Sequence, residues 1–190
     1  MNSSIFQSKI FRRAALASIV ALGAFGASNS FAAGADAPST ATVITPITIS
    51  NTQSLVFGKF APSGAAGTVT VATDNSRSQT GNVILSNSGN PVTAATFLVE
   101  GDMGSSYSIS WPAPAGLELS DNNATAPSVM TLSLLSATTA SAATTSVVTS
   151  GTLGATSGSQ IIYLGGTLTV GATQVAAAYT GSVTATGEYN

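Results

Sequence analysis

The chain has 190 residues, of which only 6% are charged, and it contains neither cysteine nor histidine. Without histidine the chain lacks the usual general base, the commonest metal ligand and every Ser-His or Cys-His nucleophile pair. After residue 32, two basic residues, Lys59 and Arg77, face seven acidic ones, which gives a net charge of -5. This balance leaves no basic patch and argues against nucleic-acid binding.

Residues 1–32 are typical of a secretory signal peptide. A basic n-region precedes an apolar run, residues 14–27, that is shorter than the roughly 20 residues needed to span a bilayer. Small residues precede the predicted cleavage point after Ala32, and a membrane anchor would need a longer run. The pair Arg12-Arg13 leaves a twin-arginine export signal as the alternative to ordinary secretion. The basic residues are Lys9, Arg12 and Arg13.

Beyond a short Ala/Gly/Pro/Ser lead-in, the chain consists of short stretches of alternating apolar and polar residues. This period of two is typical of β-strands, and we find no sustained helical period after the leader. The pattern predicts an all-β fold, an immunoglobulin-like β-sandwich of roughly eight to ten short antiparallel strands. The predicted strands are 41–49, 55–58, 67–72, 83–85, 95–100, 106–111, 117–119, 129–135, 160–170 and 178–189. Loops or polar breaks are predicted at 51–54, 61–67, 74–81 and 136–150.

The last strand combines an apolar face with a wholly polar one. Its predicted inward positions are Tyr179, Gly181, Val183, Ala185, Gly187 and Tyr189, with Thr, Ser and Glu between them. The segment 41–49 alternates in the same way, and Pro46 confines it to a sheet edge because proline cannot donate a ladder hydrogen bond. The last strand either closes a self-contained sandwich or borders a groove that a strand of another copy fills.

Few residues suggest chemistry. Glu100 and Asp102 flank a predicted hairpin turn, where acids usually serve as solvated turn residues rather than as a glycosidase pair. The turn that begins at Asp121 lacks the ligand spacing of a calcium loop. Trp111 would either stack on a sugar or pack in the core, and its place on a face with Tyr107 favours the core. We therefore expect no enzyme activity, no catalytic residue, no cofactor and no metal.

The two ends of the chain resemble those of bacterial chaperone–usher pilins, which carry an alternating N-terminal extension and end in an alternating strand with a penultimate tyrosine. Here Tyr189 is that penultimate residue. The run of the whole chain is similar to bacterial secreted domain-of-unknown-function family 4402. The similar stretches are 41–49, 55–58, 67–71, 97–101, 107–110, 165–170 and 179–183. The chain departs from the better-known pilins in lacking a cysteine pair and in having alanines at 176–178.

The resemblance implies a signal peptide at 1–32, an N-terminal extension at 33–50 and a β-sandwich domain at 51–190, which strand exchange could complete. The implied function is that of a structural subunit of a surface fibre, a pilus or fimbria, that polymerises by donor-strand β-augmentation and supports adhesion or biofilm formation. The donor residues would be Val43, Thr45, Ile47 and Ile49. The acceptor groove would be lined by the six inward residues of 179–189.

The implied partners are further copies of the chain, a periplasmic chaperone and an outer-membrane usher, with no nucleic acid and no membrane span in the mature chain. The expected location is the periplasm and then the cell surface or medium of a Gram-negative bacterium. The alternative function is that of a monomeric secreted or surface-located binding module that does not polymerise.

Overall fold

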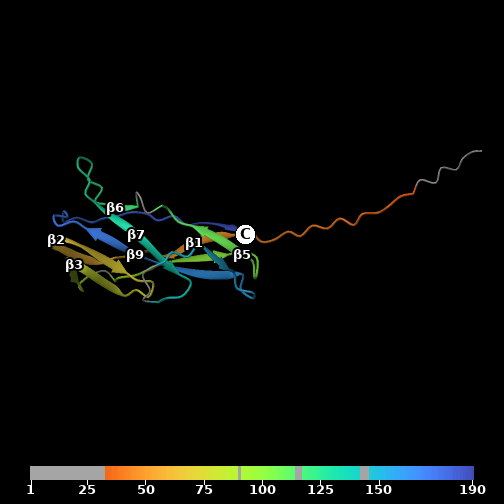
Figure 1. The fold of residues 1–190 in the computed structure, drawn as a ribbon, viewed down its shortest axis with the longest axis horizontal. Coiled ribbons are helices and arrows are strands. Elements are labelled where there is room, and N and C mark those ends of the chain that lie inside the picture. The colour runs from red at the N-terminus through yellow and green to blue at the C-terminus, as the bar shows by residue number, and fades with distance from the viewer. Residues whose placement is uncertain (1–32, 90, 114–116, 142–145) are drawn as a thin grey trace, which may run out of the picture. The chain divides into compact units, whose positions relative to one another are not determined.

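The computed structural model describes residues 33–190 except 90, 114–116 and 142–145. The predicted signal peptide therefore lies outside the described residues. The chain divides into two units, Met1–Ala41 and Thr42–Asn190. Residues 33–41 of the first unit form neither helix nor strand, and the second unit holds every strand (Figure 1).

The second unit is an all-β sandwich, as the alternation predicts, and no helix occurs among the described residues. All its strand pairs are antiparallel. The ten strands are β1 (Thr48–Gln53), β2 (Lys59–Val71), β3 (Arg77–Ser86), β4 (Ala95–Glu100), β5 (Ser106–Ser110), β6 (Glu118–Ser120), β7 (Val129–Ala137), β8 (Ser150–Thr152), β9 (Ser159–Val170) and β10 (Thr186–Tyr189). Whether the sandwich is immunoglobulin-like stays a prediction.

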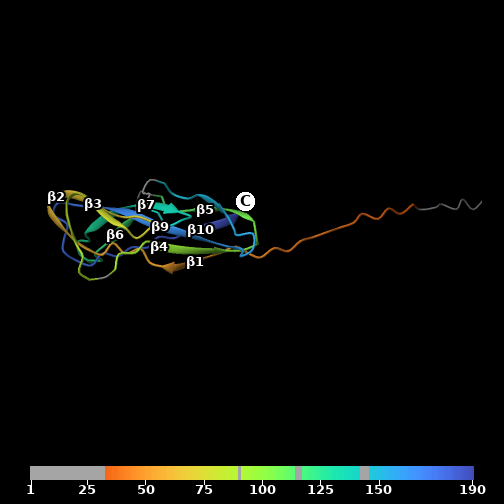
Figure 2. The same cartoon turned by 90° about the horizontal axis from the view of Figure 1, so that it is seen from below.

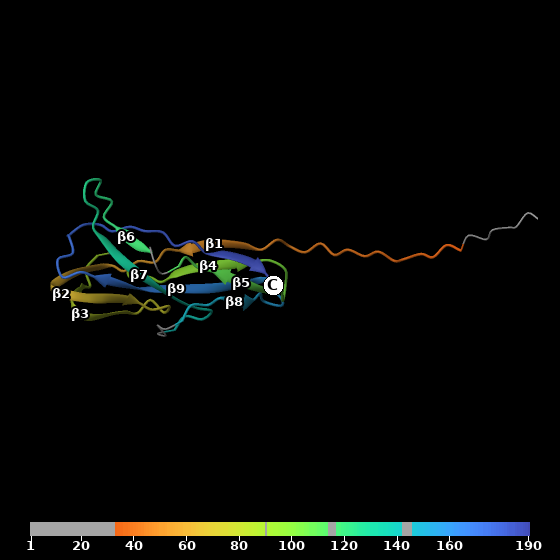
Figure 3. The ribbon, with the colours of Figure 1, turned by 45° about the horizontal axis from the view of Figure 1, so that its top comes forward.

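Strand β9 is the centre of the larger, seven-stranded sheet. The first half of β9 pairs with β4, the second half pairs with β2, and β7 pairs with residues 163–168 of β9. Strand β1 adds to β4 and β3 adds to β2, while β6 pairs with β7 (Figure 3). The smaller sheet has the order β10-β5-β8. Strands β1 and β10 are thus terminal strands of the two sheets, and parts of the two strands approach each other.

The core fills the space between the sheets and forms three neighbouring clusters. One cluster combines Val99 and Ile162 of the larger sheet with Tyr107 and Ile109 of the smaller one, together with Leu153. A second is built mainly on β2, β7 and β9, and a third on Ala95, Phe97 and Leu164. Figure 2 shows β4 and β1 on one side of the domain, with β5 and β10 on the other. Among the described residues, no helix is long and apolar enough to cross a membrane.

Several strand boundaries differ from those predicted. The first strand begins at Thr48 rather than at residue 41, just after Pro46, and it continues through the predicted polar break to Gln53. Polar residues are accommodated there because β1 is an exposed edge strand, and the Thr52 hydroxyl lies 2.7 Å from that of Thr96 on β4. A strand tolerates such residues when only one of its faces meets the core.

The predicted loop at 61–67 is wrong, because these residues belong to β2. The pairing of β2 with β3 is irregular between Pro62 and Gly67, and Gly64 has a φ of 81°. Proline and glycine, which usually signal a turn, also mark such bulges inside a strand. Conversely, the predicted strand at 55–58 is reduced to a single bridge between Val56 and Thr93.

Candidate functional site

The candidate site lies where the N-terminal segment of the second unit meets the end of the chain. We call residues 42–53 the arm, which includes β1. Its inward side chains, Ile47 and Ile49, are half-buried and pack on the core cluster of Val99, Tyr107 and Ile109. Thr48 and Ser50 alternate with them and are exposed. The arm therefore ends in an edge strand, β1, and it is attached to the domain by two isoleucines and by the pairing of β1 with β4.

The four predicted donor residues behave differently. Ile47 and Ile49 fill core positions, as just described. Thr45 is exposed, but its carbonyl oxygen accepts a hydrogen bond of 2.6 Å from the Tyr189 hydroxyl. Val43 is 97% exposed, so its side chain makes no comparable contact with its own domain. The donor pattern thus divides at Thr45 into an attached part and a solvent-exposed part.

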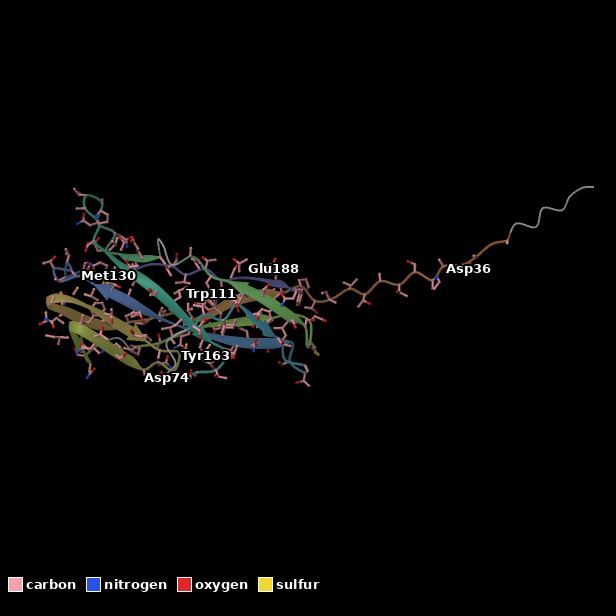
Figure 4. All side chains as sticks on the ribbon, in the orientation of Figure 1. Asp36, Asp74, Trp111, Met130, Tyr163 and Glu188 are labelled. Carbon is pink, nitrogen blue, oxygen red and sulfur yellow. The ribbon has the colours of Figure 1, made fainter. Side chains whose placement is uncertain are left out.

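The C-terminal segment, residues 179–189, alternates as the sequence predicts except at Gly181, which was predicted to face inward and is exposed. Tyr179, Val183, Ala185, Gly187 and Tyr189 are half-buried, whereas every even-numbered residue is exposed, including Glu188 (Figure 4). Regular pairing is shorter than predicted, since only Thr186–Tyr189 form a strand, on β5. Upstream, Thr180 forms a single bridge with Ser120. Only the last four residues of the segment's alternation, Thr186–Tyr189, therefore form the edge of the smaller sheet, whereas Thr180 bridges to β6.

The structure brings the predicted donor and acceptor residues together within one chain. Ile49 packs near Ala185, and Ile47 belongs to the same cluster as Ala185 and Tyr189. A Cβ built on Gly187 would lie 2.7 Å from Cδ1 of Ile49, so the missing side chain makes room for that isoleucine. Small residues at these positions admit an incoming side chain, as the sequence suggests.

Gly181 and Tyr179 lie at the start of the segment and contact other parts of the domain. A Cβ on Gly181 would lie 2.6 Å from the carbonyl oxygen of Glu118, so this glycine permits close approach to β6. The Tyr179 hydroxyl donates to the carbonyl of Val175 and lies 2.9 Å from the Ser128 hydroxyl. Among the predicted acceptor residues, Gly187 and Tyr189 therefore contact the arm directly. Gly181 instead faces β6, and the Tyr179 hydroxyl binds residues outside the arm.

An open apolar groove continues from the arm along the same side of the domain. It consists of two hollows of about 420 and 680 Å³. The two hollows share four lining residues, Leu55, Phe57, Leu119 and Tyr179. Segments 51–62 and 174–183 border this side groove, and its only charged lining residues among those described are Lys59 and Glu118. Sequence reasoning missed the side groove because its walls come from segments that are more than a hundred residues apart.

Other candidate residues have structural roles. The Asp102 carboxylate accepts a hydrogen bond of 3.0 Å from Ser105 within the β4–β5 turn. The Asp121 carboxylate accepts backbone hydrogen bonds from Asn123 and Ser128, as in a turn. Trp111 donates to the carbonyl of Val148 and packs edge-on against Phe97 with ring centroids 5.5 Å apart.

The part of the chain that the structure describes holds no group of three or more His, Cys, Asp or Glu residues that could bind a metal. Its buried side-chain nitrogen and oxygen atoms all have hydrogen-bond partners. We therefore build the candidate site from the arm, the C-terminal segment and the side groove.

Fold and site together define a β-sandwich whose N-terminal edge strand packs against its C-terminal strand. The chain belongs to the family described as Domain of unknown function (DUF4402), whose model matches residues 47–189. The matched range begins at Ile47 and ends at Tyr189, so it includes both partners of the contact. No curated protein and no solved structure matches the chain.

Proposed function

We propose that the protein is a structural subunit of a bacterial surface fibre, a pilus or fimbria, in which the arm of one copy is exchanged into the next. The observation that carries the proposal is the contact of the arm with residues 187–189, where Ile49 fills the space above Gly187 and the Thr45 carbonyl binds the Tyr189 hydroxyl. Ile47 and Ile49 pack against the core, yet Ile49 lies on the edge strand β1 and Ile47 immediately precedes it, near the start of the domain. A neighbouring copy could supply the same strand by β-augmentation, with the same main-chain and side-chain contacts.

The arm is suited to exchange because few contacts hold it. Burial of a whole isoleucine side chain is worth about 1.5 to 3 kcal/mol. Ile47 and Ile49 are half-buried, so burial contributes about 1.5 to 3 kcal/mol for the pair. Ladder hydrogen bonds with β4 add about 1 kcal/mol each. Exchange leaves the rest of the sandwich intact, since β1 is the terminal strand of its sheet.

An arm that packs on its own domain and an arm that packs on a neighbouring copy make the same contacts. The local concentration of arms therefore decides which of the two states is populated. A short linker keeps the chain's own arm at an effective concentration in about the millimolar range. An assembly site that crowds subunits would overcome this advantage. Because a head-to-tail contact of this kind does not close on itself, it propagates into a filament. The proposal therefore includes export to the periplasm, a chaperone and an outer-membrane usher as assembly partners, and a final location on the cell surface.

A second candidate function is that of a monomeric secreted or surface-located binding module. The observation that favours it is the pairing of the arm with β4 of its own chain. In that case the side groove would be the binding surface, because its floor is apolar and carries Phe57, Met130 and Leu168.

The two candidates differ in their response to a charge in the arm. The experiment compares Ile47→Arg with Val43→Arg, a control at a position that is 97% exposed. Particle size is measured by light scattering and electron microscopy on full-length exported protein, and folding is monitored by the fluorescence of Trp111. We expect wild type and Val43→Arg to form fibres and Ile47→Arg to form none. Fibres of wild-type length from Ile47→Arg would refute the proposal, and monomers from all three proteins would favour the binding module.

A further inference from the structure

The hydroxyl group of Tyr189 joins three separate parts of the domain. It accepts a hydrogen bond of 2.6 Å from the backbone N–H of Asp102, in the turn between β4 and β5. It donates a hydrogen bond of 2.6 Å to the carbonyl oxygen of Thr45, 144 residues away. A phenol can donate one hydrogen bond and accept another, so both capacities are used here.

The surroundings of Tyr189 fix its hydroxyl at this point. Its ring packs on the core cluster that holds Tyr107 and Leu153. Gly101 stands directly beside the hydroxyl, and a Cβ at Gly101 would overlap it. Gly101 thus provides the space that lets Tyr189 reach the turn and the arm at once.

The hydrogen bond to Thr45 also marks the boundary between the attached part and the exposed part of the arm. After Thr45 come Ile47 and β1, which are attached to the core and to β4. Before Thr45, Val43 is 97% exposed and Ile44 is 47% exposed, and neither belongs to a strand. The Tyr189–Thr45 bond is therefore the outermost side-chain attachment that we find for the arm among the described residues.

We propose that Tyr189 is a latch that holds the arm on its own domain and controls the rate of its release to a second copy. This inference rests on the proposed exchange of the arm, and it assigns the control of that exchange to a single hydroxyl. Tyr189 is a positioning residue, because it acts through the backbone of Thr45 rather than through contact with an incoming chain. Loss of the hydroxyl should loosen the arm and leave the rest of the sandwich in place.

The test is hydrogen–deuterium exchange of full-length protein, resolved by peptide. In Tyr189→Phe, we expect the amides of Thr48–Gln53 to exchange roughly 2- to 12-fold faster, as the loss of the one hydrogen bond to the arm implies. Gly101→Ala should have the same effect by displacing the hydroxyl while Tyr189 is retained. The matched control is Tyr179→Phe, whose hydroxyl binds Val175 and Ser128 rather than the arm. Amides of β9 serve as the internal reference in every variant.

Two outcomes would overturn the latch. One is unchanged exchange at Thr48–Gln53 in both Tyr189→Phe and Gly101→Ala. The other is an equal rise in β9, which would make Tyr189 a general stabilising residue. A second readout separates the latch from the proposed function: differently labelled copies are mixed and analysed for shared assemblies. Faster amide exchange with no mixed assemblies would support the latch and refute fibre formation by arm exchange.

Discussion

Replacement of Ile49 by alanine tests the energetic basis of the account. Ile49 is half-buried and packs against two core clusters, and its side chain fills the space above Gly187. Val43→Ala is the matched control, because Val43 lies in the same arm and is 97% exposed. Both substitutions shorten an aliphatic side chain, but only one removes core contacts.

The expected loss follows from the carbons removed. Isoleucine exceeds alanine by three carbons, each worth about 0.8 kcal/mol when it is fully buried. Since Ile49 is half-buried, the transfer term falls to about 1.2 kcal/mol, and a partly collapsed cavity adds to it. We expect Ile49→Ala to lower the free energy of unfolding by about 1 to 2 kcal/mol. Val43→Ala should change it by no more than about 0.5 kcal/mol.

Urea denaturation followed by tryptophan fluorescence measures both values. Trp111 is the single tryptophan of the chain, and it packs against the same cluster as Ile49. Its emission therefore reports on the part of the core that the arm covers. Equal effects of Ile49→Ala and Val43→Ala would refute the claim that the arm contributes core side chains.

Two further predictions concern parts of the domain away from the arm. Burial raises the pKa of the Tyr107 phenol above its ordinary value of 10.0. As the pH rises, the unfolded chain therefore loses the Tyr107 proton at a lower pH than the folded chain does. The free energy of unfolding should consequently fall as the pH rises above about 10. Tyr107→Phe should make that fall less steep in urea denaturation measured at several pH values. Arg77 donates hydrogen bonds to the carbonyls of Phe57, Lys59 and Ser86. Arg77→Met should lower the free energy of unfolding by about 1 to 3 kcal/mol. The control is Lys59→Met, because Lys59 is an exposed cation, and this substitution should lower the free energy by less than about 0.5 kcal/mol. Similar values for the two variants in urea denaturation would contradict the role of Arg77.

Alternation in the sequence predicts which side chains face the core but not which segment covers them. The inward positions Ala185 and Tyr189 follow from the period of two, because successive side chains of a strand point to opposite faces. The partner of that face is Ile49, whose place opposite Gly187 depends on how two sheets pack. Packing of this kind leaves no local pattern, so the sequence left open whether the two ends meet within one chain.

Strand boundaries are predicted best where the pattern of residues is compatible with only one local structure. The strand at β4 was predicted with its observed bounds, Ala95–Glu100, because apolar residues alternate up to a clear turn. The segment 61–67 was mistaken for a loop, since Pro62 and the following glycines are compatible with either a turn or a bulge. The side groove has no signal in the sequence, because Leu55 and Tyr179 become neighbours only in the folded domain.

A covalent trap at the contact of arm and C-terminal strand tests the central claim most directly. A Cβ at Gly187 would lie 3.5 Å from Cγ1 of Ile49, so the double variant Ile49→Cys with Gly187→Cys can form a disulfide without moving the backbone far. The wild-type chain has no cysteine, so every disulfide formed is informative. Each single-cysteine variant is a control, because it can form nothing larger than a dimer.

The measurement is a non-reducing denaturing gel of the oxidised double variant, collected from the bacterial surface. If arms are exchanged between copies, the protein will run as a ladder of covalent multimers that collapses to a single band on reduction. If the double variant is fully oxidised and still runs only as a monomer, each arm has stayed on its own domain, and the account of a fibre built by arm exchange is wrong.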